Sequence, residues 1–363
     1  MKKFNFIFAG AMLILIFQIS GSCSYKSGQS DANVMKAFDL RLSGKVDQAK
    51  ALLDSIIVRD NKNALAHYEL ARLRNYMLIG GGNVKIEDIV VSANNAVSND
   101  PGNVIYAYYK AIASFFNAFV AMEHGQEKVK PLIDLTCKEL ENVLRLKPDY
   151  HEAMMYLVEI YGMLPKDMGG DSLKAIEYSD KLAKMNLYWG AKAKAALLPE
   201  NSDRVAYWED ILAKDPKNPE ILAEVGTAYL FKDDPGNAEK YYRDAIKLDV
   251  SKNLLILNLA RFHMYKVMQN KDLGNTEFPV MKKFLEEYLK TTPEPIVPLK
   301  AYAMGLLVRA DMFLGNQEQA EKLMKETQTL DPYFSRASGV PLLLLFDPPD
   351  KIIHHYFSFF SPF

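Results

Sequence analysis

The amino-acid sequence predicts an all-α protein, an α-solenoid of about eight helical hairpins. Three observations predict this fold. Pairs of amphipathic segments recur along the chain, and small residues stand where the two helices of a pair would cross. Several pairs are closed by Asp-Pro or Lys-Pro, as at Asp100-Pro101 and Lys147-Pro148, where proline ends one helix or opens the next. No alternation of apolar and polar residues typical of strands extends far enough to predict a β-sheet instead.

Composition narrows the class of protein. The 363 residues are 49% apolar and 25% charged, as in a folded soluble chain. Lys and Arg number 44 against 45 Asp and Glu, so the net charge is -1, and no basic excess points to a nucleic acid as partner. The two cysteines, Cys23 and Cys137, are too few for a disulfide framework or a thiolate zinc site.

The first 22 residues have the parts of an export signal. Two lysines follow Met1, residues 4–19 form an apolar run, and small residues stand at 20–22. The apolar run is shorter than the roughly 20 residues that a membrane-spanning helix needs. We therefore expect residues 1–22 to be a signal peptide.

The residues around Cys23 resemble a bacterial lipoprotein signal, in which a cysteine that follows small residues is acylated. The segment departs from that pattern at Ser20, where Leu or a similar residue is usual, and Ser20 and Ser22 would also suit an ordinary signal peptidase. The resemblance implies a lipidated Cys23 and a polar tether over residues 23–33. We expect a chain anchored in the bacterial cell envelope that faces the periplasm, with the outer membrane favoured over the inner one.

The repeat is clearest at residues 218–249, where two helices are predicted with a turn between them at 233–236. Small and apolar residues recur at helical spacing on one face of each helix: Leu222, Val225, Gly226 and Tyr229 on the first, and Ala238, Tyr242 and Ala245 on the second. These offsets resemble the tetratricopeptide repeat of about 34 residues. The small residues let paired helices approach, and the aromatic rings fill the space beside them.

The same repeat pattern recurs less regularly over residues 34–335. The other hairpins are expected at residues 37–53, 70–101, 107–148, 154–182, 189–216, 255–290 and 304–332. Extra residues interrupt the spacing at 77–85, 116–126, 162–170 and 270–277, so the second helix of the seventh hairpin is expected only from Val280.

The loop Met168-Gly169-Gly170-Asp171 suits the end of one helix and the N-cap of the next. With residues 173–177 and 187–191, it also resembles a motif of exported bacterial tetratricopeptide proteins. That resemblance supports the fold and defines no reaction.

Residues 336–363 do not fit the repeat. Residues 340–346 are an apolar run, and residues 356–363 are rich in aromatic side chains. Because the open end of a solenoid must be covered, we expect a cap that folds over the last hairpin. A partner-binding hook is the alternative, since an exposed aromatic patch would otherwise invite aggregation.

Motifs for catalysis or metal binding are incomplete. His151-Glu152 begins like a zinc-protease helix, but Met155 stands where the second ligand is needed. Residues 80–82 are three glycines without the Gly-Lys-Ser/Thr of a phosphate loop, and His354-His355 point to different sides of an element. We therefore expect no enzyme activity, no metal and no cofactor, and Cys137 is expected to be a small buried side chain.

Candidate binding residues follow from the resemblance to tetratricopeptide arrays, in which the first helix of each hairpin lines a concave groove that holds peptides or partner helices. Aromatic residues, Met and Arg are enriched in such surfaces. The groove candidates are Tyr68, Arg72, Tyr76, Tyr108, Phe115, Met155, Phe231, Arg261, Tyr265, Tyr302 and Arg309. The alternative is that these side chains belong to the core, because a shift of one residue in register would bury them.

These observations favour a non-enzymatic scaffold or adaptor that binds other envelope proteins or peptides through its groove, with the membrane reached through the N-terminal lipid. The candidate arginines lie in distant hairpins, so the groove is expected to be apolar and aromatic rather than a clamp of clustered Lys and Arg. The alternative is a solute- or lipid-binding lipoprotein accessory to a transporter, with a small ligand in place of a protein partner.

Overall fold

A computed structural model of the chain describes residues 29–123 and 129–333. All regular structure in this part of the chain is helical, with sixteen α-helices, three short 3-10 helices and no strand. The all-α prediction is therefore confirmed. The chain divides into two compact units between Glu200 and Asn201. Unit 1 holds α1 to α9, and unit 2 holds α10 to α16.

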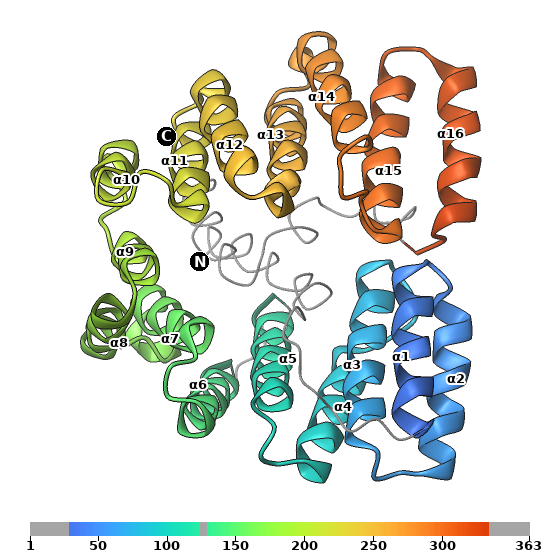
Figure 1. Cartoon of the computed structure of the whole chain (residues 1–363), viewed down its shortest axis with the longest axis vertical. Coiled ribbons are helices and arrows are strands. Elements are labelled where there is room, and N and C mark those ends of the chain that lie inside the picture. Colours follow the sequence, from blue (N-terminus) through green and yellow to red (C-terminus); the bar gives the residue numbers. More distant parts are fainter. Residues whose placement is uncertain (1–28, 124–128, 334–363) are drawn as a thin grey trace. The chain divides into compact units, whose positions relative to one another are not determined.

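Unit 1 is a series of helices in which each packs against the next along the chain (Figure 1). Its helices are α1 Gln29–Leu42, α2 Val46–Arg59, α3 Ala64–Ile79, α4 Ile86–Asn99, α5 Val104–Glu123, α6 Val129–Leu146, α7 His151–Met163, α8 Ser172–Met185 and α9 Leu187–Ala196. A short helix, η2 Lys166–Met168, fills the loop between α7 and α8. In addition, α1 contacts α3 and α7 contacts α9, so first helices of neighbouring hairpins touch.

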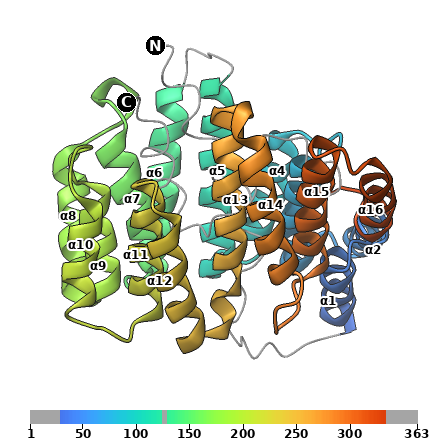
Figure 2. The same ribbon diagram turned by 90° about the horizontal axis from the view of Figure 1, so that it is seen from above.

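Unit 2 continues the same pattern (Figure 2). Its helices are α10 Arg204–Leu212, α11 Pro219–Phe231, α12 Pro235–Leu248, α13 Leu254–Gln269, α14 Gly274–Tyr288, α15 Val297–Phe313 and α16 Gln317–Leu330. Two short helices, η3 Val250–Asn253 and η4 Lys271–Leu273, precede α13 and α14. Four hairpins pack as pairs in unit 1 and three in unit 2, and the predicted fifth hairpin corresponds to α9 and α10, which belong to different units.

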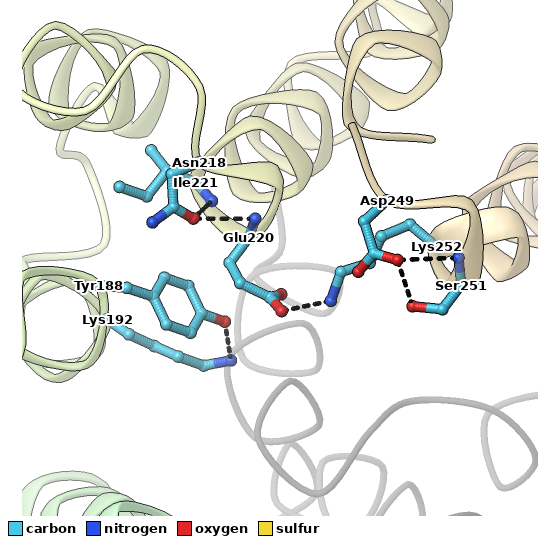
Figure 3. Close-up of polar contacts among 8 residues, drawn as sticks. All are labelled: Tyr188, Lys192, Asn218, Glu220, Ile221, Asp249, Ser251 and Lys252. Atoms are coloured by element: carbon cyan, nitrogen blue, oxygen red, sulfur yellow. Dashed lines mark hydrogen bonds and ion pairs between the residues drawn. The ribbon is translucent and has the colours of Figure 1, made fainter. Parts of the chain in front are cut away.

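Local sequence signals explain where the helices begin. The side chain of Asn218 accepts hydrogen bonds from the backbone N–H groups of Glu220 at 3.0 Å and Ile221 at 3.2 Å, and Pro219 opens α11 (Figure 3). These bonds satisfy N–H groups that a helix start leaves without partners. Asp171 caps α8 in the same way, through the N–H groups of Leu173 and Lys174, as its sequence context predicts.

The hairpin predicted most clearly has the expected crossing. Ala238, Tyr242 and Ala245 of α12 are fully buried, and Gly226 of α11 faces Tyr242. The hydroxyl groups of Thr227 and Tyr242 are hydrogen-bonded at 2.8 Å. The small residues therefore allow α11 and α12 to approach, and the tyrosine ring fills the space between them.

Two helix boundaries differ from prediction. Helix α1 begins at Gln29, so residues 29–33 are helical and not part of a tether. Helix α14 begins at Gly274 instead of Val280, and it includes Pro279. Pro279 is the sixth residue of α14, and because proline lacks a backbone N–H, the helix forms without an intrahelical hydrogen bond from this residue. The signal peptide, the lipidation of Cys23 and the C-terminal cap lie outside the described residues and stay predictions.

Within the described residues, one stretch is long and apolar enough to cross a membrane, Val104–Met122 in α5. Most of this stretch is buried inside the protein, as is usual for a core helix.

Candidate functional site

The structure separates the eleven groove candidates by their exposure. Seven are buried: Tyr68, Arg72, Tyr76, Tyr108, Phe115, Met155 and Tyr302. Four are partly exposed: Phe231, Arg261, Tyr265 and Arg309. All eleven lie on first helices, but the buried seven contact other parts of the protein instead of solvent. The expectation that all eleven candidates form one accessible surface is therefore corrected. These seven side chains belong to the core.

Ring contacts show what several buried candidates touch. The ring centroids of Tyr108 and Tyr150 are 4.8 Å apart, and those of Phe115 and Tyr156 are 5.9 Å apart. Met155 belongs to an apolar cluster with Met154 and Val158 of α7, Leu182 of α8, and Ala193 and Ala196 of α9. These side chains hold neighbouring hairpins of unit 1 together.

A buried cluster of arginine and aromatic side chains joins α1, α3 and α5 in unit 1. We call it the Arg41 cluster, and its members are the half-buried Phe38 and the buried Arg41, Tyr68, Glu69, Arg72 and Tyr109. Nε of Arg41 donates to Oε1 of Glu69 at 2.6 Å, and Nη1 of Arg72 donates to Oε2 of Glu69 at 3.2 Å. Arg41 is 0% exposed, and Glu69 and Arg72 are also buried. Both oxygens of the one carboxylate are therefore engaged by the two guanidinium groups.

Aromatic rings surround these charges. The Cζ atoms of Arg41 and Arg72 each lie 5.3 Å from the centroid of the Phe38 ring, and Cζ of Arg72 lies 5.4 Å from that of Tyr68. The Tyr68 and Tyr109 rings meet edge to face, with centroids 5.2 Å apart. Cations are attracted to ring faces at such distances. A continuous series of contacts thus runs from Arg41 on α1 to Tyr109 on α5.

The Arg41 cluster holds more hydrogen-bond donors than its own residues satisfy. Nη1 and Nη2 of Arg41 and the hydroxyl of Tyr109 are buried without hydrogen-bond partners. Burial raises the pKa of the Tyr109 phenol well above its usual range, against the opposing effect of Arg72 and Arg41, so the hydroxyl keeps its proton and stays a donor.

Sequence reasoning missed Arg41 and expected the arginines to be dispersed. The structure instead brings Arg41 beside Arg72, one on each of two neighbouring first helices. The available signal was the position of Arg41 three residues after Phe38 on a helix, which places both side chains on one face. A basic pair is therefore present in unit 1.

Among the described residues, the buried Asp, Glu, Lys, Arg and His side chains favour the first helices. They are Arg41 on α1, His67, Glu69 and Arg72 on α3, Glu159 on α7, Lys192 on α9, Glu224 on α11, His263 on α13 and Asp311 on α15. Nζ of Lys192 donates to the hydroxyl of Tyr188 at 3.3 Å (Figure 3). Glu139 on α6 and Asp331 after α16 are the described exceptions. Because buried charge is costly, this bias distinguishes the first helices from the second helices.

Unit 2 carries the partly exposed candidates. Arg261 and Tyr265 are one turn apart on α13, and Nη1 of Arg261 donates to Asn258 at 3.2 Å. Lys266 of the same helix pairs with Asp233 at 3.1 Å and with Glu277 at 3.6 Å, which joins α13 to the turn after α11 and to α14. Burial raises the pKa of the Tyr265 phenol, so it too remains protonated.

Among the residues that the structure describes, no group of three or more His, Cys, Asp and Glu side chains is placed to hold a metal ion. Cys137 is a free thiol and is buried on α6.

No protein-family model and no curated protein matches the chain. Its similarities are to solved structures. TTC0263, a thermophilic tetratricopeptide protein of Thermus thermophilus, is 16% identical over 64% of this chain and 98% of its own, with a TM-score of 0.39. A tetratricopeptide protein of Parabacteroides merdae is 14% identical over 86% and 100%, with a TM-score of 0.34. YrrB, a tetratricopeptide protein with an unusual peptide-binding site, is 13% identical over 56% and 95%, with a TM-score of 0.29.

The hairpins themselves define the class of protein. Small residues at the crossings, rings beside them and first helices that touch one another are the features of a helical-repeat array of the tetratricopeptide type.

Proposed function

We propose that this chain is a non-enzymatic interaction protein that binds another protein through the first helices of unit 2. The observation that carries the proposal is exposure: of the eleven groove candidates, only Phe231, Arg261, Tyr265 and Arg309 are partly open to solvent. We call these four residues the unit 2 face. They come from α11, α13 and α15, the first helices of three successive hairpins.

The side chains of the unit 2 face suit a protein partner. Tyr, Phe and Arg combine a large contact area with polar groups, and such residues carry much of the binding energy in interfaces. Large apolar side chains are also exposed at the ends of the same helices, with Met268 on α13 43% exposed and Met312 and Phe313 on α15 57% and 45% exposed. A surface of this kind is more typical of an interface than of a solvated helix face.

The same proposal places the protein at a membrane of the cell envelope through a lipid on Cys23. Its support is the sequence of residues 1–23 alone. Fractionation of cells tests it: Cys23→Ala should move the protein from the membrane to the soluble periplasmic fraction. A variant that stays with the membrane would show that something other than this lipid holds it there.

Affinity capture from the native envelope, with gentle crosslinking, tests the interaction. The intact chain is compared with an Arg261→Ala, Tyr265→Ala double variant of α13. A matched control is Lys247→Ala, Leu248→Ala, which also removes one cation and one apolar side chain but from exposed positions on the second helix α12. Melting temperatures of all three chains establish that each is folded.

The expected result is a specific protein that the intact chain and the control retain and the α13 variant loses. Retention by all three chains would exclude the unit 2 face as the docking surface. If the α13 variant melts at a much lower temperature, Arg261 and Tyr265 stabilise the fold, and the Arg309→Ala variant on α15 then tests the same face.

A further inference from the structure

We propose that an ion pair between two hairpins, Asp233 with Lys266, positions the unit 2 face. The pair sets the spacing between Phe231 of α11 and Tyr265 of α13, so its two members are positioning residues for the docking surface. The inference rests on the proposed function, which assigns Phe231 and Tyr265 to the partner. It starts from the backbone of Asp233, the only non-glycine residue in the described part of the chain with a positive φ, at 57°.

The turn that contains Asp233 has two counterparts, at Gly44 between α1 and α2 and at Gly315 between α15 and α16, where φ is 74° and 80°. In the turns at Asp233, Gly44 and Gly315, the N–H of this residue donates to the carbonyl three residues back, at 3.1, 3.2 and 3.4 Å. The following N–H donates to the carbonyl five residues before it, at 2.9, 2.8 and 2.8 Å. Glycine adopts this left-handed conformation at no steric cost, whereas a residue with a Cβ atom is strained. The chain therefore has glycine in two of three equivalent turns and aspartate in the third.

Neither space nor burial accounts for aspartate at position 233. A Cβ atom on Gly315 would meet no atom within 4 Å, so backbone conformation and not lack of space favours glycine in this turn. Asp233 is exposed, so its side chain does not fill the core. Strained residues persist where other interactions hold them, and they are concentrated at functional sites. We therefore attribute the aspartate to the contact that its carboxylate makes.

The carboxylate of Asp233 reaches the next hairpin. Nζ of Lys266 on α13 lies 3.1 Å from Oδ1 of Asp233 and 3.6 Å from Oε1 of Glu277 on α14. The other oxygen of Glu277, Oε2, lies 2.5 Å from Nδ1 of His263 on α13. Burial lowers the pKa of Lys266, but the two carboxylates outweigh this effect and raise it, so the ammonium group stays charged. Lys266 is thus held in its own hairpin by Glu277 and pairs with the preceding hairpin through Asp233.

The ion pair lies close in the chain to the two residues that it positions. Phe231 is two residues before Asp233, and backbone hydrogen bonds from residues 232–234 back to α11 make the helix end and the turn one hydrogen-bonded segment. Tyr265 immediately precedes Lys266 on α13. Because a binding surface depends on supporting residues that fix its side chains, the pair determines how Phe231 and Tyr265 are presented together.

Hydrogen exchange of the full chain, measured by mass spectrometry, tests the pair without any partner. Asp233→Gly removes the carboxylate and gives the turn its best-suited residue, so the melting temperature should stay within about 2 °C of the unaltered chain or rise. Exchange at the ends of α11 and α13 should nevertheless become about twofold to fivefold faster, as expected for the loss of one partly solvated ion pair. A residue that served the turn alone would give slower exchange when replaced by glycine.

Variants of the lysine separate its charge from its bulk. Lys266→Met keeps an unbranched side chain and removes the charge, so exchange in the same segments should accelerate about twofold to fivefold or more. Lys266→Arg keeps the charge and should exchange like the unaltered chain. Lys247→Met is the matched control, because Lys247 pairs with Asp244 of its own helix, and it should leave exchange in α13 unchanged.

Affinity capture then tests the positioning role. The amount of partner retained should fall about twofold or more with Asp233→Gly and Lys266→Met, and Lys266→Arg should recover it. Because the glycine variant is expected to be at least as stable as the unaltered chain, unfolding would not explain its lower retention.

Unchanged exchange in both Asp233→Gly and Lys266→Met would overturn the inference, as would an equal acceleration by Lys247→Met. Faster exchange with unchanged capture would also overturn it, because the pair would then join hairpins without positioning the docking surface. If the intact chain retains no protein at all, the proposed function fails and the positioning role fails with it. Exchange in the variants would still show whether the pair holds α11 to α13, so the two failures are distinguishable.

Discussion

The ring of Tyr242 on α12 occupies the space that a side chain at residue 226 of α11 would need. A Cβ atom on Gly226 would lie 2.5 Å from Cδ1 of Tyr242 and 3.1 Å from the backbone oxygen of Ala238. Tyr242 is fully buried, and its hydroxyl is held by Thr227. The ring therefore cannot move away without loss of packing and of a hydrogen bond, so this hairpin requires glycine at position 226.

Gly226→Ala should lower the free energy of unfolding by about 1–3 kcal/mol, the usual cost of overpacking. A decrease in stability would be informative, because alanine in a helix interior is otherwise favoured over glycine by about 1 kcal/mol. Gly236→Ala in the same hairpin is the matched control, since its Cβ would meet only Asp234 Oδ1 at an ordinary 3.7 Å. Urea unfolding measures both, and equal stability of the two variants would contradict the close approach of α11 and α12.

Gly274 gives a contrasting case at the start of α14. A Cβ there would lie 2.2 Å from Cζ of Phe313, which is closer than the contact at Gly226. Phe313 is 45% exposed, however, and the clashing atoms are the far end of its ring, which can turn toward solvent. We expect Gly274→Ala to cost less than about 1 kcal/mol in the same unfolding measurement. A loss as large as that of Gly226→Ala would show that the Phe313 ring is held in place.

These residues show which parts of the structure local sequence could predict. Gly226, Ala238 and Tyr242 lie within one hairpin, so helical spacing and residue size were enough to pair them. Arg41 and Glu69 are 28 residues apart and meet only because α1 packs against α3. No periodicity within one helix reports that contact, so the charged cluster of unit 1 was missed.

For a related reason, the sequence could not predict which of the groove candidates are exposed. Tyr76 and Tyr265 occupy first helices and have similar apolar neighbours in the sequence, yet Tyr76 is fully buried and Tyr265 is partly exposed. The difference depends on the tertiary packing around each helix, which periodicity within the helix does not report. Register alone therefore placed the candidates on first helices without separating core from surface.

The ion pair between Arg243 of α12 and Glu287 of α14 predicts a dependence of stability on pH. Nη1 and Nη2 of Arg243 donate to the two oxygens of Glu287 at 2.7 and 3.0 Å. These bonds lower the pKa of Glu287, against the effect of burial. The stabilisation is therefore present above the unfolded pKa of about 4.3 and is lost as the pH falls through the lower folded pKa.

Glu287→Gln should reduce the free energy of unfolding at pH 7 by no more than about 1 kcal/mol, because the pair is partly solvated. The variant and the unaltered chain should differ less at pH 3, where the carboxylate is protonated in the unfolded chain. Glu286→Gln, at the exposed neighbouring position, is the control and should change neither value. A constant difference between Glu287→Gln and the unaltered chain from pH 7 to pH 3 would show that the hydrogen-bond geometry matters and the charge does not.

Cys137 on α6 should be unreactive in the folded protein. Burial raises the pKa of its thiol to about 11, against the effect of a hydrogen bond with Tyr161. Since the thiolate is the nucleophile and an unfolded cysteine has a pKa of about 8.5, the folded chain at pH 8 holds on the order of a hundredfold less thiolate. In a Cys23→Ser background, where Cys137 is the remaining cysteine, iodoacetamide should alkylate the native chain at least about a hundredfold more slowly than the chain in urea. Similar rates in both states would mean that α6 opens readily from its hairpin, because a thiol held between helices is protected by its environment as well as by its pKa.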